Sequence, residues 1–137
     1  MGDVQEHNKA QVRRLIDEMW NQGKLEVADE VFAPDFNNLN PGPDEEPGTA
    51  GLKGHVRLDR EAFADYKVVI DEMVADGDLV VVRQSWSGKH VGLRRGFAPT
   101  GKVIRGSAVN FFRFADGRIV ERWGIVDALG VMRQMAS

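Results

Sequence analysis

The sequence contains no cysteine, and this absence excludes several kinds of site at once. Without thiols there is no disulfide framework, no thiolate nucleophile and no thiolate metal ligand, which agrees with a reducing compartment. Histidine is almost as scarce, with three residues far apart in the chain and no His-x-x-x-His pair. A dedicated metal site is therefore not expected.

An excess of positive charge and long apolar runs are missing too. Lys and Arg total 18 against 21 Asp and Glu, a formal net charge of -3, with both signs spread along the chain. Such a chain lacks the basic stripe that nucleic-acid binding requires, and anionic membranes attract it little. Residues 1–14 are polar where a signal peptide needs an apolar segment. The sequence predicts a cytoplasmic protein that binds neither nucleic acid nor membranes.

Proline is scarce outside one segment, because four of the five prolines fall within residues 34–54. This segment is predicted to be a long loop. Apolar residues at three- and four-residue steps predict a helix over residues 4–20, a shorter one over 25–32 and a third over 55–66. At 137 residues, 42% hydrophobic and 28% charged, the chain fits one globular domain spanning residues 1–137.

After residue 66 the pattern becomes that of β-strands. Two Asp-Gly dipeptides, at 76–77 and 116–117, predict tight hairpins, because a type I′ turn needs positive φ at both residues. Helices followed by strands predict an α+β domain with the helices on one side of a mostly antiparallel sheet. The runs rich in Val, Ile, Phe and Trp cover residues 67–75, 79–91, 102–114 and 119–126, and residues 129–135 add a last helical turn.

The second hairpin predicts what each face of the sheet carries. If Asp116-Gly117 is a two-residue turn and the strands are regular, Asn110 opposes Trp123. One face, with Asn110, Phe112, Trp123 and Asp127, then lies beneath the helices. The other face is also partly apolar, which predicts a homodimer through the outer face of the sheet; a tail or loop folded over it is the alternative. This outer set comprises Val109, Phe111, Val120 and Val126.

Three stretches of the chain resemble one family. Phe32-Ala33-Pro34-Asp35-Phe36, Pro99-Thr100-Gly101-Lys102 and residues 116–123 followed by Asp127 look like SnoaL-like polyketide cyclases, of the nuclear-transport-factor-2-like superfamily. The resemblance implies a cone-shaped barrel, a strongly curved, mostly antiparallel sheet wrapped around three N-terminal helices, with a deep pocket and no cofactor. It also implies that an aspartate in a Trp-x-x-x-Asp pattern, here Asp127, acts as general acid/base in an aldol ring closure.

The chain departs from the family's pattern at two expected pocket positions. The family's long loop often carries a histidine, and at that position this chain has Leu39, which lies between Asn37 and Asn40. The strand before the second Asp-Gly turn also lacks the family's histidine, and Asn110 is the nearest polar residue there. We expect Asn37, Asn40 and Asn110 to contact the substrate.

Two catalytic candidates follow from the residues. Beside Trp123, the carboxyl of Asp127 would be desolvated, which raises a carboxyl pKa toward the range that acid/base catalysis needs. The alternative is that Asp127 caps the helix at 129–135. His90 shares a strand face with Trp86 and would polarise a carbonyl or move a proton, unless it is a surface residue beside a turn.

For the other candidate residues, an ordinary structural role is the alternative to a functional one. Trp86, Trp123 and Phe112 are expected to wall an aromatic pocket, although ordinary core packing explains them equally well. His55 opens a helix and is expected to be a capping or exposed residue. The turn at residues 94–95 is either a basic pocket rim or a solvated loop.

Three functions fit this domain. The first is a cofactor-independent cyclase, of the lyase or isomerase class, that acts on a polyketide-like molecule of secondary metabolism. The second is a hydrolase or dehydratase in which the same carboxylate activates water through Asn37, Asn40 or Asn110. The third is a ligand-binding module without chemistry, since one scaffold hosts many functions.

Overall fold

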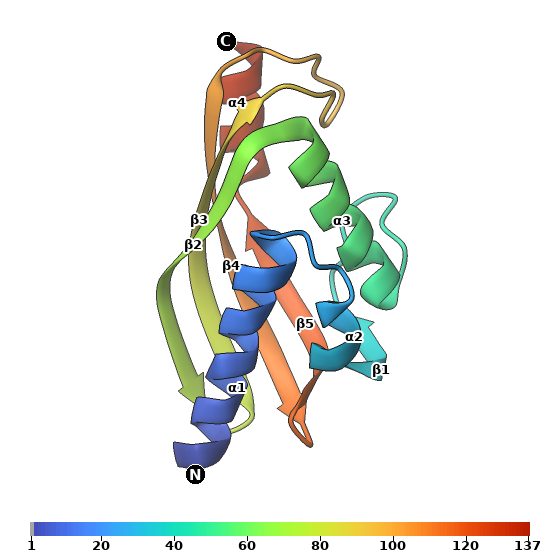
Figure 1. The fold of residues 1–137 in the computed structure, drawn as a ribbon, viewed down its shortest axis with the longest axis vertical. Coiled ribbons are helices and arrows are strands. Elements are labelled where there is room, and N and C mark those ends of the chain that lie inside the picture. Colours follow the sequence, from blue (N-terminus) through green and yellow to red (C-terminus); the bar gives the residue numbers. More distant parts are fainter. Residues whose placement is uncertain (1) are drawn as a thin grey trace.

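A single curved sheet with helices on its concave face makes up the fold. The computed structural model describes residues 2–137, and Figure 1 shows α1, α2 and α3 lying on the same side of the sheet. The helices are α1 (Gly2–Arg14), which continues into the π-helical segment η1 (Leu15–Trp20), α2 (Val27–Val31), α3 (Gly48–Ala62) and α4 (Ala128–Ala136). The strands are β1 (Phe32–Asn38), β2 (Phe63–Asp76), β3 (Leu79–His90), β4 (Val103–Ala115) and β5 (Arg118–Val126).

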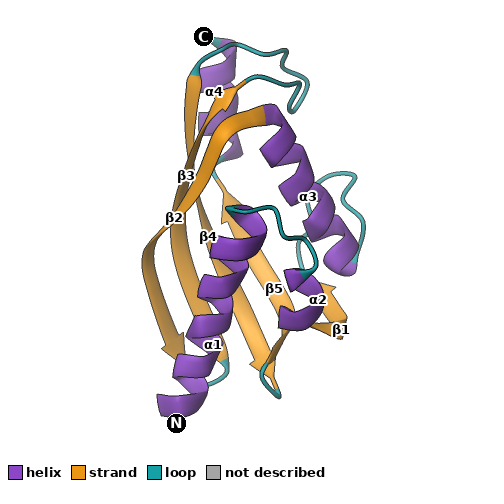
Figure 2. Ribbon diagram, viewed as in Figure 1, coloured by secondary structure: helices purple, strands orange, loops and turns teal. Residues whose placement is uncertain are grey.

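The sheet has the strand order β1-β5-β4-β3-β2 (Figure 2). β1 runs parallel to β5, and the other neighbours are antiparallel. The predicted α+β class with a mostly antiparallel sheet is therefore confirmed. The sheet curls around the helices and stays open, so the cone is not a closed barrel. Within residues 2–137 no helix is long and apolar enough to cross a membrane.

The core lies between the helices and the concave face of the sheet. Helical residues spaced three and four apart turn inward, because that spacing places them on one face. They meet the residues of β3 and β4 that alternate toward the helices. The fully buried members of this cluster include Val12, Leu15, Met19, Val31, Val56, Val80 and Val82.

The prediction of one loop over residues 34–54 was wrong. β1 occupies its beginning and α3 starts at Gly48. Phe36 and Asn38 point inward along β1, while Pro34 stays exposed. β1 is an edge strand, and an edge tolerates proline because the missing N–H interrupts no interior ladder. The third helix correspondingly lies earlier than residues 55–66, since β2 begins at Phe63.

The second hairpin forms as predicted at its turn and differs beyond it. Asp116 and Gly117 have φ of 51° and 82°, and Phe114 opposes Ile119. A β-bulge then shifts the pairing, so that Arg113 opposes Glu121 and Val120 is the extra residue. One extra residue exchanges the two faces of everything that follows.

The bulge overturns the predicted sides of Trp123 and Val126. Trp123 opposes Phe111, with ring centroids 5.6 Å apart, on the convex face, and it is 40% exposed. Val126 opposes Ala108 on the concave face, so it does not belong to the outer set. Gly124, and not Trp123, is the residue of β5 that faces Asn110.

Candidate active site

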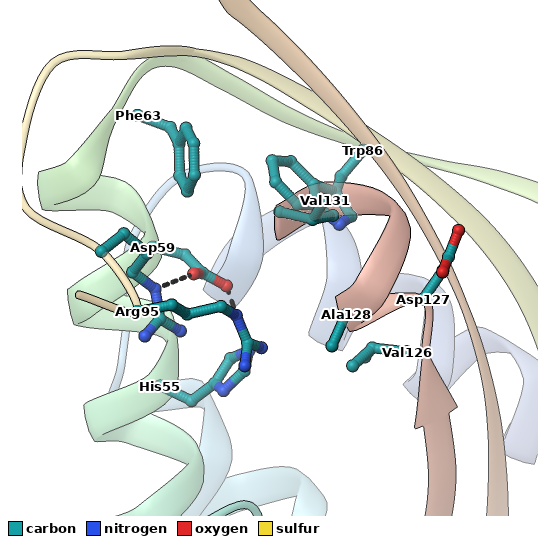
Figure 3. Close-up of a pocket in the computed structure, with 10 residues that line it drawn as sticks. His55, Asp59, Phe63, Trp86, Arg95, Val126, Asp127, Ala128 and Val131 are labelled. Atoms are coloured by element: carbon teal, nitrogen blue, oxygen red, sulfur yellow. Dashed lines mark hydrogen bonds and ion pairs between the residues drawn. The ribbon is translucent and has the colours of Figure 1, made fainter. Parts of the chain in front are cut away.

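A pocket opens between α3, the loop joining β3 to β4, and the start of α4 (Figure 3). Its polar side consists of His55, Asp59, Arg94 and Arg95. Its apolar side consists of Phe63, Trp86, Val126, Ala128 and Val131.

Asp59 is the centre of the polar side. Its Oδ2 lies 3.0 Å from Nε2 of His55, and its Oδ1 accepts a 2.7 Å hydrogen bond from Nε of Arg94. His55 and Asp59 are four residues apart on α3, which puts them on one helical face. Arg94 reaches them from the β3–β4 loop. Asp59 is only 8% exposed, so both cations hold a carboxylate away from water.

The cluster sets the charge of each member. Burial alone would lower the pKa of His55, but hydrogen bonds to Asp59 and Glu45 outweigh it and raise that pKa to about 9. Burial alone would raise the pKa of Asp59, but the hydrogen bond and charge of His55, with Arg94, hold it below its usual value. At neutral pH the pair is therefore an imidazolium and a carboxylate.

Glu45 completes the surroundings of His55 on the side away from Asp59. Its Oε1 lies 3.5 Å from Nδ1 of His55, and its Oε2 accepts a 2.8 Å hydrogen bond from the backbone N–H of Gly42. These bonds lower the pKa of Glu45 although its burial opposes them. The contact at Nδ1 is longer than the one at Nε2, so Nδ1 is the less tightly held nitrogen of His55.

The apolar side is aromatic. The Trp86 ring packs 5.0 Å from that of Phe63 and 5.6 Å from that of Tyr66. Gly106 faces Trp86 from β4, and a Cβ there would overlap the indole, so glycine makes room for the ring. Burial raises the pKa of the Tyr66 phenol, which therefore stays neutral beside the pocket. Trp86 thus lines the pocket, and its contact with a substrate stays a prediction.

Asp127 lies at the edge of the pocket but turns away from its polar side. Its Oδ1 accepts a 3.0 Å hydrogen bond from the backbone N–H of Gly130, which makes it the N-cap of α4. Figure 3 shows its carboxylate pointing away from Asp59. The capping interaction expected as the alternative is therefore present, and a role of Asp127 as general acid/base stays a prediction.

His90 is fully buried and is absent from the pocket lining. Thr100 covers its Nδ1, which accepts a 3.3 Å hydrogen bond from the Thr100 N–H, and the ring packs 5.5 Å from that of Phe63. Its Nε2 has no partner among the residues that the structure describes. The alternative reading of His90 as a surface residue was wrong, and its catalytic role stays a prediction.

The other predicted contact residues are spread over the sheet. Asn37 is exposed, and both side-chain ends of Asn40 bind the backbone of Gly124. Phe112 is a core residue, with its ring 6.4 Å from that of Phe32. Asn110 is buried on the concave face and is absent from the pocket lining. The structure therefore brings Trp86 and Asp127 to one pocket and places Asn40 and Asn110 on either side of Gly124, whereas Asn37 and Phe112 lie apart from both pairs.

Of the four residues on the polar side, Arg94 and Arg95 belong to the turn that the sequence offered as a basic pocket rim, whereas the roles of His55 and Asp59 were missed. His55 was expected to be capping or exposed, and Asp59 was not considered. Their spacing of four within a predicted helix was the available signal, since it places an imidazole beside a carboxylate. Nothing local in the sequence indicates that Arg94 joins them. Among residues 2–137, no three His, Asp or Glu side chains are grouped so as to hold a metal ion.

Comparison with known proteins places this fold and pocket in a family. The family model described as SnoaL-like polyketide cyclase matches residues 10–135. The chain belongs to this family. The resemblance seen in the sequence is thus confirmed, and membership of the cyclase family makes the protein an enzyme of the lyase or isomerase class.

Curated cyclases and solved structures agree with this assignment. The chain is 30% identical to aklanonic acid methyl ester cyclase AcmA of Streptomyces galilaeus, covering 92% of this chain and 88% of the relative. It is 28% identical to nogalonic acid methyl ester cyclase of Streptomyces nogalater, covering 85% and 88%. A structure from Jannaschia sp., described as a SnoaL-like polyketide cyclase, matches with a TM-score of 0.86 and 27% identity, covering 98% of this chain and 94% of the other.

Proposed function

We propose that the protein closes a ring in a polyketide-like methyl ester by an intramolecular aldol reaction that needs no cofactor. The names of the curated relatives support this substrate class, because they are cyclases of aklanonic acid methyl ester and nogalonic acid methyl ester. The observation that carries the proposal is the His55–Asp59–Arg94 cluster, which is built around a buried carboxylate and faces an aromatic wall in one pocket.

The reaction needs two proton transfers. A C–H flanked by carbonyls loses its proton, the resulting carbanion attacks a second carbonyl carbon of the same molecule, and the alkoxide oxygen takes up a proton. One C–C bond forms, and the product has the mass of the substrate. A single acid/base couple serves both transfers if the proton removed from carbon is returned to oxygen.

His55 is proposed as this couple. Asp59 accepts a hydrogen bond from Nε2 of His55 and so keeps the proton on that nitrogen. The other ring nitrogen, Nδ1, then exchanges the proton with the substrate once the substrate displaces the long contact with Glu45. Neutral His55 takes the carbon-bound proton, and the imidazolium returns it to the alkoxide. Asp59 is a positioning residue that orients the ring and stabilises its cation.

The two guanidinium groups and the aromatic wall complete the proposal. Arg94 keeps Asp59 ionised, and Arg95 projects a second positive charge at the rim toward substrate oxygens. Phe63 and Trp86 offer an apolar surface for a planar ring system and keep water from the reacting carbon. Charge interactions gain strength in such a dry site.

The test is turnover of aklanonic acid methyl ester by the purified protein, followed by mass spectrometry in labelled water. Cyclisation gives a product of unchanged mass without label from the water oxygen. His55→Gln and Asp59→Asn should lower turnover by at least about a hundredfold, the scale of one general acid/base group. Uptake of labelled oxygen would indicate the hydrolase, loss of water the dehydratase, and binding without turnover the ligand-binding module.

A homodimer through the convex face also stays a proposal, with a second copy of the chain as its occupant. The support is an apolar groove on that face, in which Leu39, Phe111 and Trp123 lie beside Arg113 and Glu121. Arg113 and Glu121 form an ion pair within the chain, with Nε and Oε1 3.5 Å apart, so the groove holds no unbalanced charge that would oppose a second copy. The cytoplasmic location likewise stays a prediction.

A further inference from the structure

A guanidinium without a carboxylate partner among residues 2–137 lies on the concave face, on the strand whose end lines the pocket. Arg122 of β5 donates from Nε to Oδ1 of Asn110 at 2.9 Å and from Nη1 to Oδ1 of Asn38 at 3.2 Å. Both acceptors are neutral amides. Within residues 2–137 no Asp or Glu oxygen lies within ion-pair distance of Arg122. Burial lowers the pKa of Arg122, and the more distant charge of Glu45 offsets this only in part.

The sheet leaves room for this guanidinium at Gly124. A Cβ on Gly124 would overlap Oδ1 of Asn110 and Nη2 of Arg122, so only glycine leaves room for both. Asn40 binds the backbone of Gly124 from the other side and secures the strand at this position. The arrangement therefore draws on β1, β4 and β5 and on the residues that follow β1.

The cluster also holds a donor with nothing to bind. Asn38 is 7% exposed, and its Nδ2 has no hydrogen-bond partner within residues 2–137. Its orientation is set by Arg122, because a guanidinium only donates and requires the Oδ1 of Asn38. A buried donor left unpaired costs about 1–3 kcal/mol. Such a donor beside an uncompensated positive charge fits an acceptor that is supplied from outside the chain.

The side chain of Asn110 is held in place by hydrogen bonds at both ends of its amide. Its Oδ1 accepts from Arg122 and its Nδ2 donates to Oε1 of Gln84 at 3.2 Å, so both amide ends are committed. Gln84 alternates with Trp86 along β3, and Gly124 alternates with Val126 along β5. Since Trp86 and Val126 line the pocket, the cluster lies two residues further along the same face of the sheet from the pocket wall.

We propose that Arg122 and Asn38 form an anion-binding subsite that holds a negatively charged oxygen of the ligand, an enolate or a carboxylate. The inference deepens the proposed cyclisation, in which an enolate is formed, by assigning its oxygen to Arg122 while the exchanged proton stays at His55. The oxygen gains a charge-assisted hydrogen bond from Arg122 and satisfies Nδ2 of Asn38.

The test compares two planar probes of one shape, 2-naphthoate and 2-naphthamide, by isothermal titration calorimetry at neutral pH. The wild-type protein should bind the carboxylate at least about tenfold more tightly than the amide, as a charge-assisted bond predicts. Arg122→Gln should remove this preference. Arg113→Gln, the same substitution on the convex face, should keep it. A preference that is missing from the wild type, or that survives in Arg122→Gln, overturns the proposal.

A second variant covers the case in which Arg122→Gln does not fold. Asn38→Asp is nearly isosteric and supplies the missing carboxylate from within the chain, so it should abolish the preference for 2-naphthoate. Circular dichroism verifies its fold, and an unchanged preference in the folded variant also overturns the proposal. None of these measurements needs turnover, so failure of the subsite and failure of the proposed cyclisation are distinguishable.

Discussion

Nε2 of His55 lies 3.0 Å from Oδ2 of Asp59, one helical turn further along α3. Arg94 holds the other oxygen of the same carboxylate at 2.7 Å. The helix thereby presents an imidazolium and a carboxylate to the pocket as one unit. Because each group stabilises the charge of the other, the protonation of His55 is linked both to the stability of the fold and to the proposed chemistry.

The first prediction concerns stability against pH. The pKa of His55 in the folded protein, about 9, lies above its ordinary value of 6.5. The contribution of His55 to the free energy of unfolding is therefore fully present below pH 6.5 and is lost as the pH rises to 9. We expect the wild type to lose about 2 kcal/mol of unfolding free energy over this window, a figure reduced for partial exposure. Urea unfolding of the wild type and His55→Gln measures it. Equal slopes for the two proteins would contradict the linkage.

The second prediction concerns the rate against pH. If neutral His55 is the base, kcat/KM rises with pH and levels off near pH 9. Removing the charge of Glu45 takes away one cause of the raised pKa, so Glu45→Gln should move the rise to lower pH. The pH–rate profiles of both proteins give the result. A profile that is flat from pH 6 to 9, or one unmoved by Glu45→Gln, contradicts this role of His55.

The architecture was predictable because it rests on local signals. Asp116-Gly117 predicted its turn, since two successive residues with positive φ favour that pair. The bulge at Val120 was not predictable, because one extra residue leaves no mark in the apolar alternation and yet moves Trp123 to the convex face. β1 was missed because Pro34 resembles a loop residue and its pairing partner β5 lies far along the chain.

The site was less predictable than the fold for a related reason. Trp86 was identified from alternation along a single strand, which is a local property. The cluster around Asp59 joins a helix to a loop that follows 35 residues later, and only the fold brings Arg94 there. Asp127 illustrates the opposite case, because its preference for capping the following helix is local and is what the structure shows.

The third prediction separates the two roles considered for Asp127. Asp127→Ala removes the cap of α4 and should lower the unfolding free energy by about 1 kcal/mol, whereas Asp127→Ser keeps a capping oxygen and should cost little. Ser also lacks a carboxylate. Thermal unfolding and turnover of both variants should give Asp127→Ser as stable and active. A stable but inactive Asp127→Ser would instead establish Asp127 as the acid/base.

The fourth prediction tests the aromatic wall. In Gly106→Ala the new methyl group overlaps the indole of Trp86, which must turn toward the pocket or away from Phe63. Overpacking of this kind costs roughly 1–3 kcal/mol. We expect a lower melting temperature, a shifted tryptophan emission and a higher KM. Gly77→Ala is a comparison variant with open space around the new methyl group, although its φ of 61° adds some backbone strain. Unchanged emission and KM in Gly106→Ala would show that Trp86 does not shape the pocket.

The fifth prediction tests the dimer on the convex face. Trp123 is 40% exposed there, and its aromatic contact is with Phe111 of the same face, so Trp123→Glu should leave the core intact while placing a charge in the proposed interface. Analytical ultracentrifugation at micromolar concentration should find the wild type as a dimer and this variant as a monomer. Leu93→Glu, at a position 70% exposed on the β3–β4 loop, should remain dimeric. If instead the wild type sediments as a monomer, the apolar convex face has another occupant.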